Sequence, residues 1–349
     1  MNTKSLMAST NQYDAIVIGG GHNSECPRRA VVGSLFAALL LCSLRISAQE
    51  PAQPCDIPLV VRRIDIKSRE LVMVNGLARE NVEVQLDAVP AKVEGMSLDS
   101  SPKRIALILD ASRNIPEDEW TLETEMASSL VENARPSDQF TFQVIGVPGT
   151  TVSSLSGREI KEQLGKLAVS RPPAANEQEK IYDALVAVAS SLNPPQFGDA
   201  IFLFGHDMDF GSLATSGQTR EPILKQRIRF FAMSFADPLA KLPPGTDLNK
   251  PLPEKLNFGM SELALLSAET GYFFSFHAVH NVKRPGQNDL VKSFLSDLYA
   301  SIAEPYRLTI RTSAGRDPLE LKVSVVNLKD PDIRLREIQY PKAIYPCFP

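Results

Sequence analysis

The chain has 349 residues, a length that suits one large domain with additions or two modest domains. Hydrophobic residues make up 43% and charged residues 22%, which is typical of an ordinary soluble globular protein. The formal net charge of -4 argues against a nucleic-acid-binding role and against a polybasic membrane-surface role.

The first feature along the chain is YDAIVIGGGHNSE, Tyr13–Glu25, in which an apolar strand runs into three glycines. This stretch resembles the first strand and turn of flavin amine-oxidase and carotenoid-desaturase-like proteins. A dinucleotide-binding fingerprint needs a strand, a glycine turn and a helix within one βαβ unit. Gly19 and Gly21 fill the first two glycine positions, but Ser24 stands at the third and Pro27 follows. We therefore expect no flavin site, and a flavin-dependent oxidoreductase fragment is the remote alternative.

Residues 28–49 have the layout of a secretory signal peptide: two arginines, an apolar run from Ala30 to Leu44, and a small residue at Ala48. The run is about fifteen residues, shorter than the roughly twenty of a membrane-spanning helix. We expect cleavage after Ala48, so residues 1–48 comprise a spurious N-terminal stretch plus the signal peptide. The mature protein is then periplasmic, on the cell surface or secreted. An uncleaved signal anchor is the alternative.

Two cysteines remain beyond this leader, Cys55 and Cys347, because Cys26 and Cys42 lie within it. An exported protein with one cysteine near each end is a good candidate for a disulfide. We predict a Cys55–Cys347 bond that joins the two ends.

The mature chain begins with a β-rich lead-in over residues 49–100, where short strands such as LVVRRIDIK and LVMVNGL are expected. The pattern changes at RIALILD, Arg104–Asp110, which is continuously apolar, as a strand buried on both faces should be. Asn114 with Glu117 predicts the cap of the helix that follows.

Strands and helices alternate from there. The strands are FTFQVIGV, AIFLF, IRFFAMSF and YFFSF. One intervening helix is opened by Ser156 and Glu159, one runs from Ile181 to Leu192, and the others contain MSELALLSAET and DLVKSFLSDLYASIA. This alternation predicts an α/β fold with a doubly wound, mostly parallel sheet and helices on both faces. The tail, residues 306–349, returns to strands and forms a β-rich C-terminal extension.

Several segments occur in an order and spacing that are fairly specific: IALILDASRN, EKIYDALVAVASSL, DAIFLFGHDMDFGS, RFFAMSF, LALLSAETGYFF and SIAEPYRLTI. Together they resemble a von Willebrand factor type A domain of the secreted bacterial kind. The resemblance implies a von Willebrand A/Rossmann-like domain over residues 101–305, preceded by the β-rich lead-in and followed by the β-rich extension.

The resemblance also implies a metal-ion-dependent adhesion site at the carboxyl ends of the strands. Its family pattern is Asp-x-Ser-x-Ser after the first strand, a Thr from a later loop, and an Asp after the fourth strand. These oxygen ligands suit Mg²⁺. Asp110 and Ser112 match the first two positions, whereas Asn114 replaces the second Ser. Glu179 lies near the Thr position, and His206 stands where the family has Asp.

The pattern is therefore that of a degenerate site. Its candidate ligands are Asp110, Ser112, Asn114, Glu179, His206, Asp207 and Asp209. One interpretation is a metal-free site, in which Asn114 caps a helix, Asp110 holds loop backbone and His206 is a satisfied loop histidine.

Two other interpretations keep a metal ion. In the first, Asp110, Ser112 and one of Asp207 or Asp209 hold a divalent cation such as Mg²⁺ through water. The second adds His206 and Glu179 as ligands, which would favour Mn²⁺ or Zn²⁺.

Other polar residues give weaker signals. His277 and His280 are interpreted as an exposed loop pair, and Trp120 either packs against the sheet or anchors a partner. The chain has no nucleophile elbow, no phosphate loop and no Cys/His dyad, so we expect no enzyme. The leading hypothesis is an exported, noncatalytic binding module whose partner is an unknown protein or cell-surface ligand, not a nucleic acid. The alternative is a structural scaffold component of a periplasmic or cell-surface assembly.

Overall fold

The computed structural model describes residues 53–64, 71–112, 115–147, 151–172, 180–205, 209, 211–234, 254–271, 274–276, 287–312, 315, 317–328 and 335–347. The contacts within the chain place all of them in one unit, Gln49–Pro349. The stretch Tyr13–Glu25, the expected signal peptide and the pair His277 and His280 lie outside the described residues. No described helix is both long enough and apolar enough to cross a membrane.

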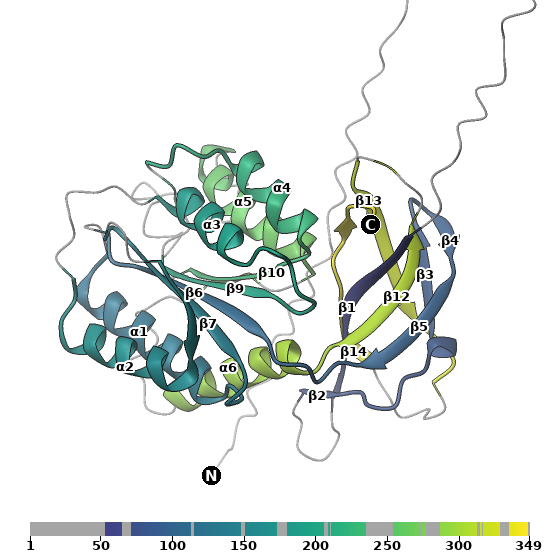
Figure 1. Ribbon diagram of the computed structural model, residues 1–349, viewed down its shortest axis with the longest axis horizontal. Helices are drawn as coiled ribbons and strands as arrows, with labels where there is room; N and C mark the ends of the chain where they lie inside the picture. Colours follow the sequence, from purple (N-terminus) through teal and green to yellow (C-terminus); the bar gives the residue numbers. More distant parts are fainter. Residues whose placement is uncertain are drawn as a thin grey trace, which may run out of the picture. The chain divides into compact units, whose positions relative to one another are not determined.

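A six-stranded sheet forms the centre of the α/β part (Figure 1). Its strands are β6 (Arg104–Asp110), β7 (Gln139–Ile145), β8 (Val152–Ser156), β9 (Ala200–Gly205), β10 (Arg229–Ser234) and β11 (Phe274–Phe276), in the order β11-β10-β9-β6-β7-β8. All neighbours pair in parallel except β8, which is antiparallel to β7. The predicted mostly parallel sheet is thus confirmed in part, since one edge strand is antiparallel.

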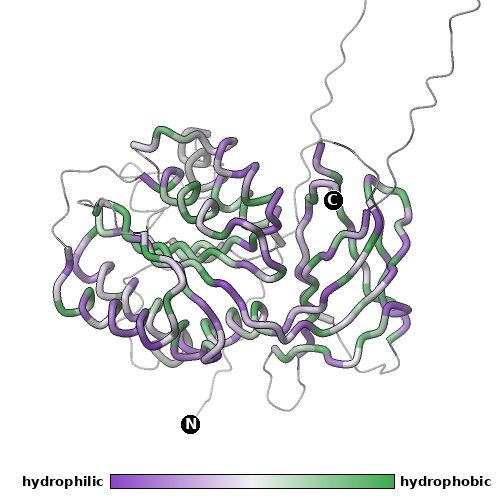
Figure 2. The backbone as a smooth tube through the Cα atoms, viewed as in Figure 1, coloured by the Kyte–Doolittle hydropathy of each residue, from purple (hydrophilic) through white to green (hydrophobic). Residues whose placement is uncertain are grey.

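Helices cover both faces of this sheet because the strands are apolar on both sides. On one face lie α1 (Glu117–Glu132), α2 (Gly157–Val169) and α6 (Gln287–Ala303). On the other face lie α3 (Ile181–Ser191), α4 (Ser216–Lys225) and α5 (Glu254–Glu269). Figure 2 shows hydrophobic strands between the two helix layers.

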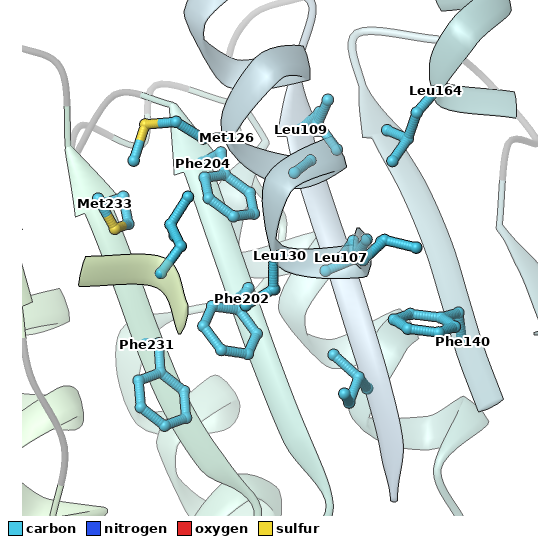
Figure 3. Close-up of a cluster of buried hydrophobic side chains, with 14 of the residues drawn as sticks. Leu107, Leu109, Met126, Leu130, Phe140, Leu164, Phe202, Phe204, Phe231 and Met233 are labelled. Carbon is cyan, nitrogen blue, oxygen red and sulfur yellow. The ribbon is translucent and has the colours of Figure 1, made fainter. Parts of the chain in front are cut away.

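The strand β6 contributes side chains to two hydrophobic cores, one on each face of the sheet. Leu107 and Leu109 point into the first core, whereas Ala106 and Ile108 belong to the second. Successive side chains of a strand point to opposite faces, so a continuous apolar run is buried on both. Figure 3 shows Leu107 and Leu109 in one cluster with Met126 and Leu130 of α1 and with the phenylalanines of the neighbouring strands.

The remaining strands form two antiparallel sheets. One contains β1 (Gln53–Ile64), β2 (Leu71–Met73), β5 (Val93–Leu98), β12 (Tyr306–Thr312) and β14 (Leu335–Gln339). The other contains β3 (Val82–Leu86), β4 (Val89–Ala91), β13 (Leu319–Val325) and β15 (Ala343–Ile344), and a 3-10 turn spans Arg79–Asn81. Because β12 lies between β1 and β5, and β13 pairs with β3, the described residues of segments 49–100 and 306–349 build one β domain together.

The predicted disulfide is confirmed. Cys55 in β1 is bonded to Cys347, and their Cα atoms are 5.6 Å apart. Both side chains are buried in the core of the β domain. The bond closes a loop across a sequence separation of 292 residues.

Local helix signals had mixed outcomes. The capping box of Ser156 and Glu159 is confirmed at the start of α2. The start predicted for α1 was wrong, because the helix begins at Glu117 with Pro116 as its N-cap residue and without a side-chain cap. Proline fixes φ near the helical value and can open a helix without donating to it. Two elements of the α/β part were missed: the strand β8 and the helix α4.

Candidate functional site

The site lies where the sheet changes winding direction. The chain passes from β6 to β7 on one side, and from β9 to β10 on the other, while β6 and β9 are neighbours. In open α/β sheets this switch point opens a crevice beyond the carboxyl ends of the strands. Asp110 ends β6 and Gly205 ends β9, so these two residues stand at the crevice.

Two glycines let the backbone close tightly around the loop that follows β6. Gly205 has φ 148°, and a Cβ atom there would lie 2.6 Å from the Cβ of Asp110. Gly146 has φ 83°, and a Cβ atom there would lie 3.0 Å from the Cα of Ser112. Both positions therefore require glycine, for conformation and for space.

Asp110 and Ser112 are fully buried and are linked to each other. The Ser112 N–H donates to Asp110 Oδ1 at 2.9 Å, and the Asp110 N–H donates to Glu123 Oε2 at 2.9 Å. Glu123 comes from α1 and is also fully buried. Among the described residues, neither Ser112 Oγ nor Glu123 Oε1 has a hydrogen-bond partner.

Burial, followed by the nearby negative charge of Asp110, raises the pKa of the Glu123 carboxyl well above its usual value. The folded protein thus favours the neutral form of this carboxyl. A neutral Glu123 can accept the Asp110 N–H without placing a second negative charge beside Asp110.

An arginine holds the other side of the same loop. Arg171, just beyond α2, donates from Nη2 to the Ser112 carbonyl and from Nη1 to the Ile115 carbonyl, each at 2.6 Å. Its guanidinium also lies 5.7 Å from the ring centre of Trp120. Trp120 is buried and donates from Nε1 to the Leu167 carbonyl at 3.2 Å, so it packs inside the protein and does not face a partner.

Asp209 belongs to a separate network. Its Oδ1 accepts from the Tyr182 N–H at 3.2 Å and from the Ser212 hydroxyl at 2.5 Å. Asp183 in turn accepts from the N–H groups of Leu213 and Ala214. These reciprocal bonds fasten the loop after β9 to the first turn of α3.

The structure therefore brings together two of the candidate ligands, Asp110 and Ser112. Asp209 serves the start of α3 instead. The other four candidates, Asn114, Glu179, His206 and Asp207, lie outside the described residues. The sequence interpretation missed Glu123 and Arg171. Glu123 had one signal, since it lies three residues after Trp120 and three before Met126, on the apolar side of α1.

The three described candidates, Asp110, Ser112 and Asp209, do not form a divalent-cation site by themselves. Among the described residues no group of three or more His, Cys, Asp or Glu side chains is arranged to hold a metal ion. The Asp209 oxygens already accept three hydrogens, from Tyr182 N–H and from the N–H and hydroxyl of Ser212. Arg171 adds a positive charge to the loop that contains Ser112. Mg²⁺ requires near-octahedral oxygen coordination, which these residues do not supply.

Two exposed apolar side chains belong to segments that end or begin near this edge of the sheet. Val169 is 90% exposed at the end of α2, two residues before the arginine that binds the Ser112 carbonyl. Leu213 is 93% exposed in the loop after β9, and its backbone N–H is bonded to Asp183. They have the largest exposed fractions among the large hydrophobic residues that the structure describes.

No family model and no curated protein matches the chain. Among solved structures, it is similar to proximal thread matrix protein 1 from the mussel byssus, with 14% identity and a TM-score of 0.42 over 61% of this chain and 49% of that one. It is similar to a von Willebrand factor type A protein from Catenulispora acidiphila, with 9% identity and a TM-score of 0.42 over 85% of this chain and 75% of that one. BatB from Bacteroides thetaiotaomicron shows 16% identity and a TM-score of 0.39 over 56% of this chain and 98% of that one. The chain spans about half of the mussel protein.

Proposed function

We propose that this chain is an exported, noncatalytic binding module of von Willebrand A type. It recognises another protein or a surface polymer at the carboxyl edge of its six-stranded sheet. The proposal is supported by the motif order around IALILDASRN and by the switch point between β6 and β9. Ligands of open α/β folds bind at that point.

The observation that carries the proposal is the pair Val169 and Leu213. Val169 is 90% and Leu213 93% exposed, although each is connected to a firmly bonded part of the edge. A side chain presented by an ordered backbone loses little conformational entropy on binding. Burial of one such side chain contributes about 1.5–3 kcal/mol, which corresponds to tenfold or more in affinity.

The buried loop after β6 acts as a support. Asp110, Ser112 and Glu123 are fully buried, so the partner meets the surface that they hold in place, not the carboxylates themselves. On this view partner capture needs no divalent cation, because Asp110 Oδ1 and Asp209 Oδ1 already accept backbone N–H groups within the protein.

Capture from cell-envelope extract tests the proposal. The immobilised protein is compared with a Val169→Ser/Leu213→Ser double variant, and bound partners are quantified by mass spectrometry with and without a chelator. We expect the double variant to lose at least about tenfold of the captured partner. We expect the chelator to change nothing.

Val89→Ser is the matched control, since Val89 is 64% exposed but lies on β4 of the β domain. The control also separates the proposal from the scaffold alternative, in which the β domain makes the contacts. Loss of capture in Val89→Ser but not in the double variant would favour the scaffold. Loss of capture with chelator alone would show that a metal ion is required.

A further inference from the structure

A second cleft lies at the opposite, amino edge of the same sheet. It has a volume of about 240 Å³. Its walls come from the loop 195–198 before β9, from residues 225–227 at the end of α4 and just after it, and from Asp56, Pro58 and Arg307 of the β domain. The cleft therefore contains residues of both the sheet and the β domain, and it shares none with the carboxyl edge.

Three cations line this cleft, and two of them have carboxylate partners. Arg307 binds Asp56 at 3.0 Å and Asp99 at 3.1 Å, and its guanidinium lies 4.1 Å from the ring centre of Phe197. Lys225 binds Glu221 at 2.5 Å. Asp56 is satisfied as well, because its Oδ1 accepts from the Thr309 hydroxyl at 2.7 Å.

Arg227 is different. Its Nη2 contacts Cys347 Sγ and lies 3.9 Å from Cys55 Sγ, and disulfide sulfurs are weak acceptors. Its Nε is buried and has no hydrogen-bond partner among the described residues. Desolvation lowers the pKa of this guanidinium, and the charge of Asp56 opposes that effect. No carboxylate of the described residues lies within ion-pair distance of Arg227.

A partly buried cation without a counter-charge destabilises a fold, because burial removes its hydration and nothing replaces it. The backbone of Arg227 is moreover held at φ 56°, a value that residues other than glycine rarely adopt. Its neighbour Gln226 also has a buried Oε1 without a partner among the described residues. The cleft thus offers a guanidinium that has no ion-pair partner among the described residues, beside apolar walls from Pro58, Pro195 and Phe197.

We propose that this cleft binds a small organic carboxylate, whose anionic group pairs with Arg227 and whose apolar body rests against Pro58, Pro195 and Phe197. Guanidinium groups match carboxylates in geometry and form strong charge-assisted hydrogen bonds with them. The volume is below the roughly 300–1,000 Å³ of pockets for drug-sized ligands, so the ligand is a small one.

Calorimetric titration of the purified protein with benzoate tests this site, because benzoate combines a carboxylate with a flat apolar body. Inorganic phosphate, at equal ionic strength, serves as an anion without an apolar body. We expect the parent protein to bind benzoate more tightly than phosphate. Arg227→Gln should weaken benzoate binding at least about tenfold, which is the usual value of a charge-assisted hydrogen bond.

Lys225→Gln is the matched control, since it removes a cation of the same cleft that already has a carboxylate partner. It should change benzoate affinity by less than about threefold. Because Arg227 touches the disulfide, the bond is verified by mass spectrometry in each variant. If Arg227→Gln does not fold, NMR of the unsubstituted protein replaces it, and the Arg227 Nε–Hε resonance must shift on titration with benzoate.

Three results would overturn the proposal: no binding at about 10 mM benzoate, equal affinity in Arg227→Gln and the parent, or tighter binding of phosphate than of benzoate. None of them bears on partner capture at the carboxyl edge, so the two sites are tested separately.

Discussion

Gly205 shows how a single hydrogen atom in place of a side chain shapes the candidate site. Substitution Gly205→Ala would place a Cβ 2.6 Å from the Cβ of Asp110, at a backbone φ of 148°. The strained backbone alone costs about 1–3 kcal/mol, and Asp110 must also move. We expect the free energy of unfolding to fall by at least that amount, measured by chemical denaturation.

Gly165→Ala is expected to raise the free energy of unfolding in the same experiment. Gly165 lies inside α2, is exposed, and has nothing within 4 Å of an added Cβ. Alanine in a helix interior is favoured over glycine by about 0.5–1 kcal/mol. A Gly205→Ala variant as stable as the parent would show that the β6 and β9 ends are not in close contact.

The residues of the site were predictable where their hydrogen-bond partners are close in the sequence. They were not predictable where the partners are distant in the sequence. Asp110 and Ser112 follow a buried strand directly, so their proximity follows from the sequence. Asp209 has the same residue type but accepts from the start of α3, twenty-seven positions away. Arg171 could not be assigned from its neighbours, because its partners are carbonyls beyond β6.

At the scale of elements, the strongly apolar strands were predicted and the weakly patterned elements were missed. The strands β6, β9 and β10 are almost completely buried, and each is a continuous apolar run. By contrast, β8 is largely exposed, with Ser154 at φ 61°, so it has no clear period. α4 contains Pro222, which breaks the helical pattern even though the helix continues through it.

The signal for α4 was its capping box. Thr215 accepts from the Gln218 N–H, and Gln218 Oε1 accepts from the Thr215 N–H at 2.9 Å. Because proline already removes one hydrogen bond inside this helix, its start should matter. Thr215→Ala is expected to lower the free energy of unfolding by about 1 kcal/mol in a denaturation experiment.

Ser216→Ala, one residue later, is the control for α4. Ser216 is already helical and is not the capping residue, so its replacement should change stability by less than about 0.5 kcal/mol. Equal effects of the two substitutions would mean that the capping box does not stabilise α4.

At the scale of the whole molecule, arginines fasten the end of α6 to the rest of the chain. Arg229 donates to the carbonyls of Ser301 and Ile302, at 2.9 Å and 3.0 Å. Arg135 donates to the Ala303 carbonyl, and Arg62 of the β domain binds the Ser301 hydroxyl. Cations are favoured at helix C-termini, where carbonyls lack partners. The last turn before β12 is therefore held from both the sheet and the β domain.

Strands from both ends of the described chain form the β domain. The cysteine positions indicated that the two ends meet, but the strand patterns did not. The sequence predicted β-rich segments on either side of the α/β part. It did not predict that β12 inserts between β1 and β5, since each strand pattern fixes which side chains face inward but not which strand is the neighbour. Pairing across such sequence distance carries a large loop-closure cost.

The Cys55–Cys347 disulfide offsets that cost, so its loss should lower the stability of the whole protein. The bond joins residues separated by 292 positions, and it lies in the core shared by β1 and β12. Closing a long loop restricts the unfolded chain, which stabilises the folded state by about 3–5 kcal/mol. We expect a reductant to lower the denaturation midpoint of the parent protein to that of a Cys55→Ser/Cys347→Ser variant.

The variant itself should not respond to the reductant, and this insensitivity separates the disulfide from other effects of the reagent. The circular dichroism spectra of the two proteins before denaturation should be alike. The pairing of β1 with β12 and β14 is made by backbone hydrogen bonds, which do not require the disulfide. An unchanged midpoint on full reduction, verified by thiol counting, would contradict the prediction. It would mean that the pairing of the two ends already restricts the chain without the covalent bond.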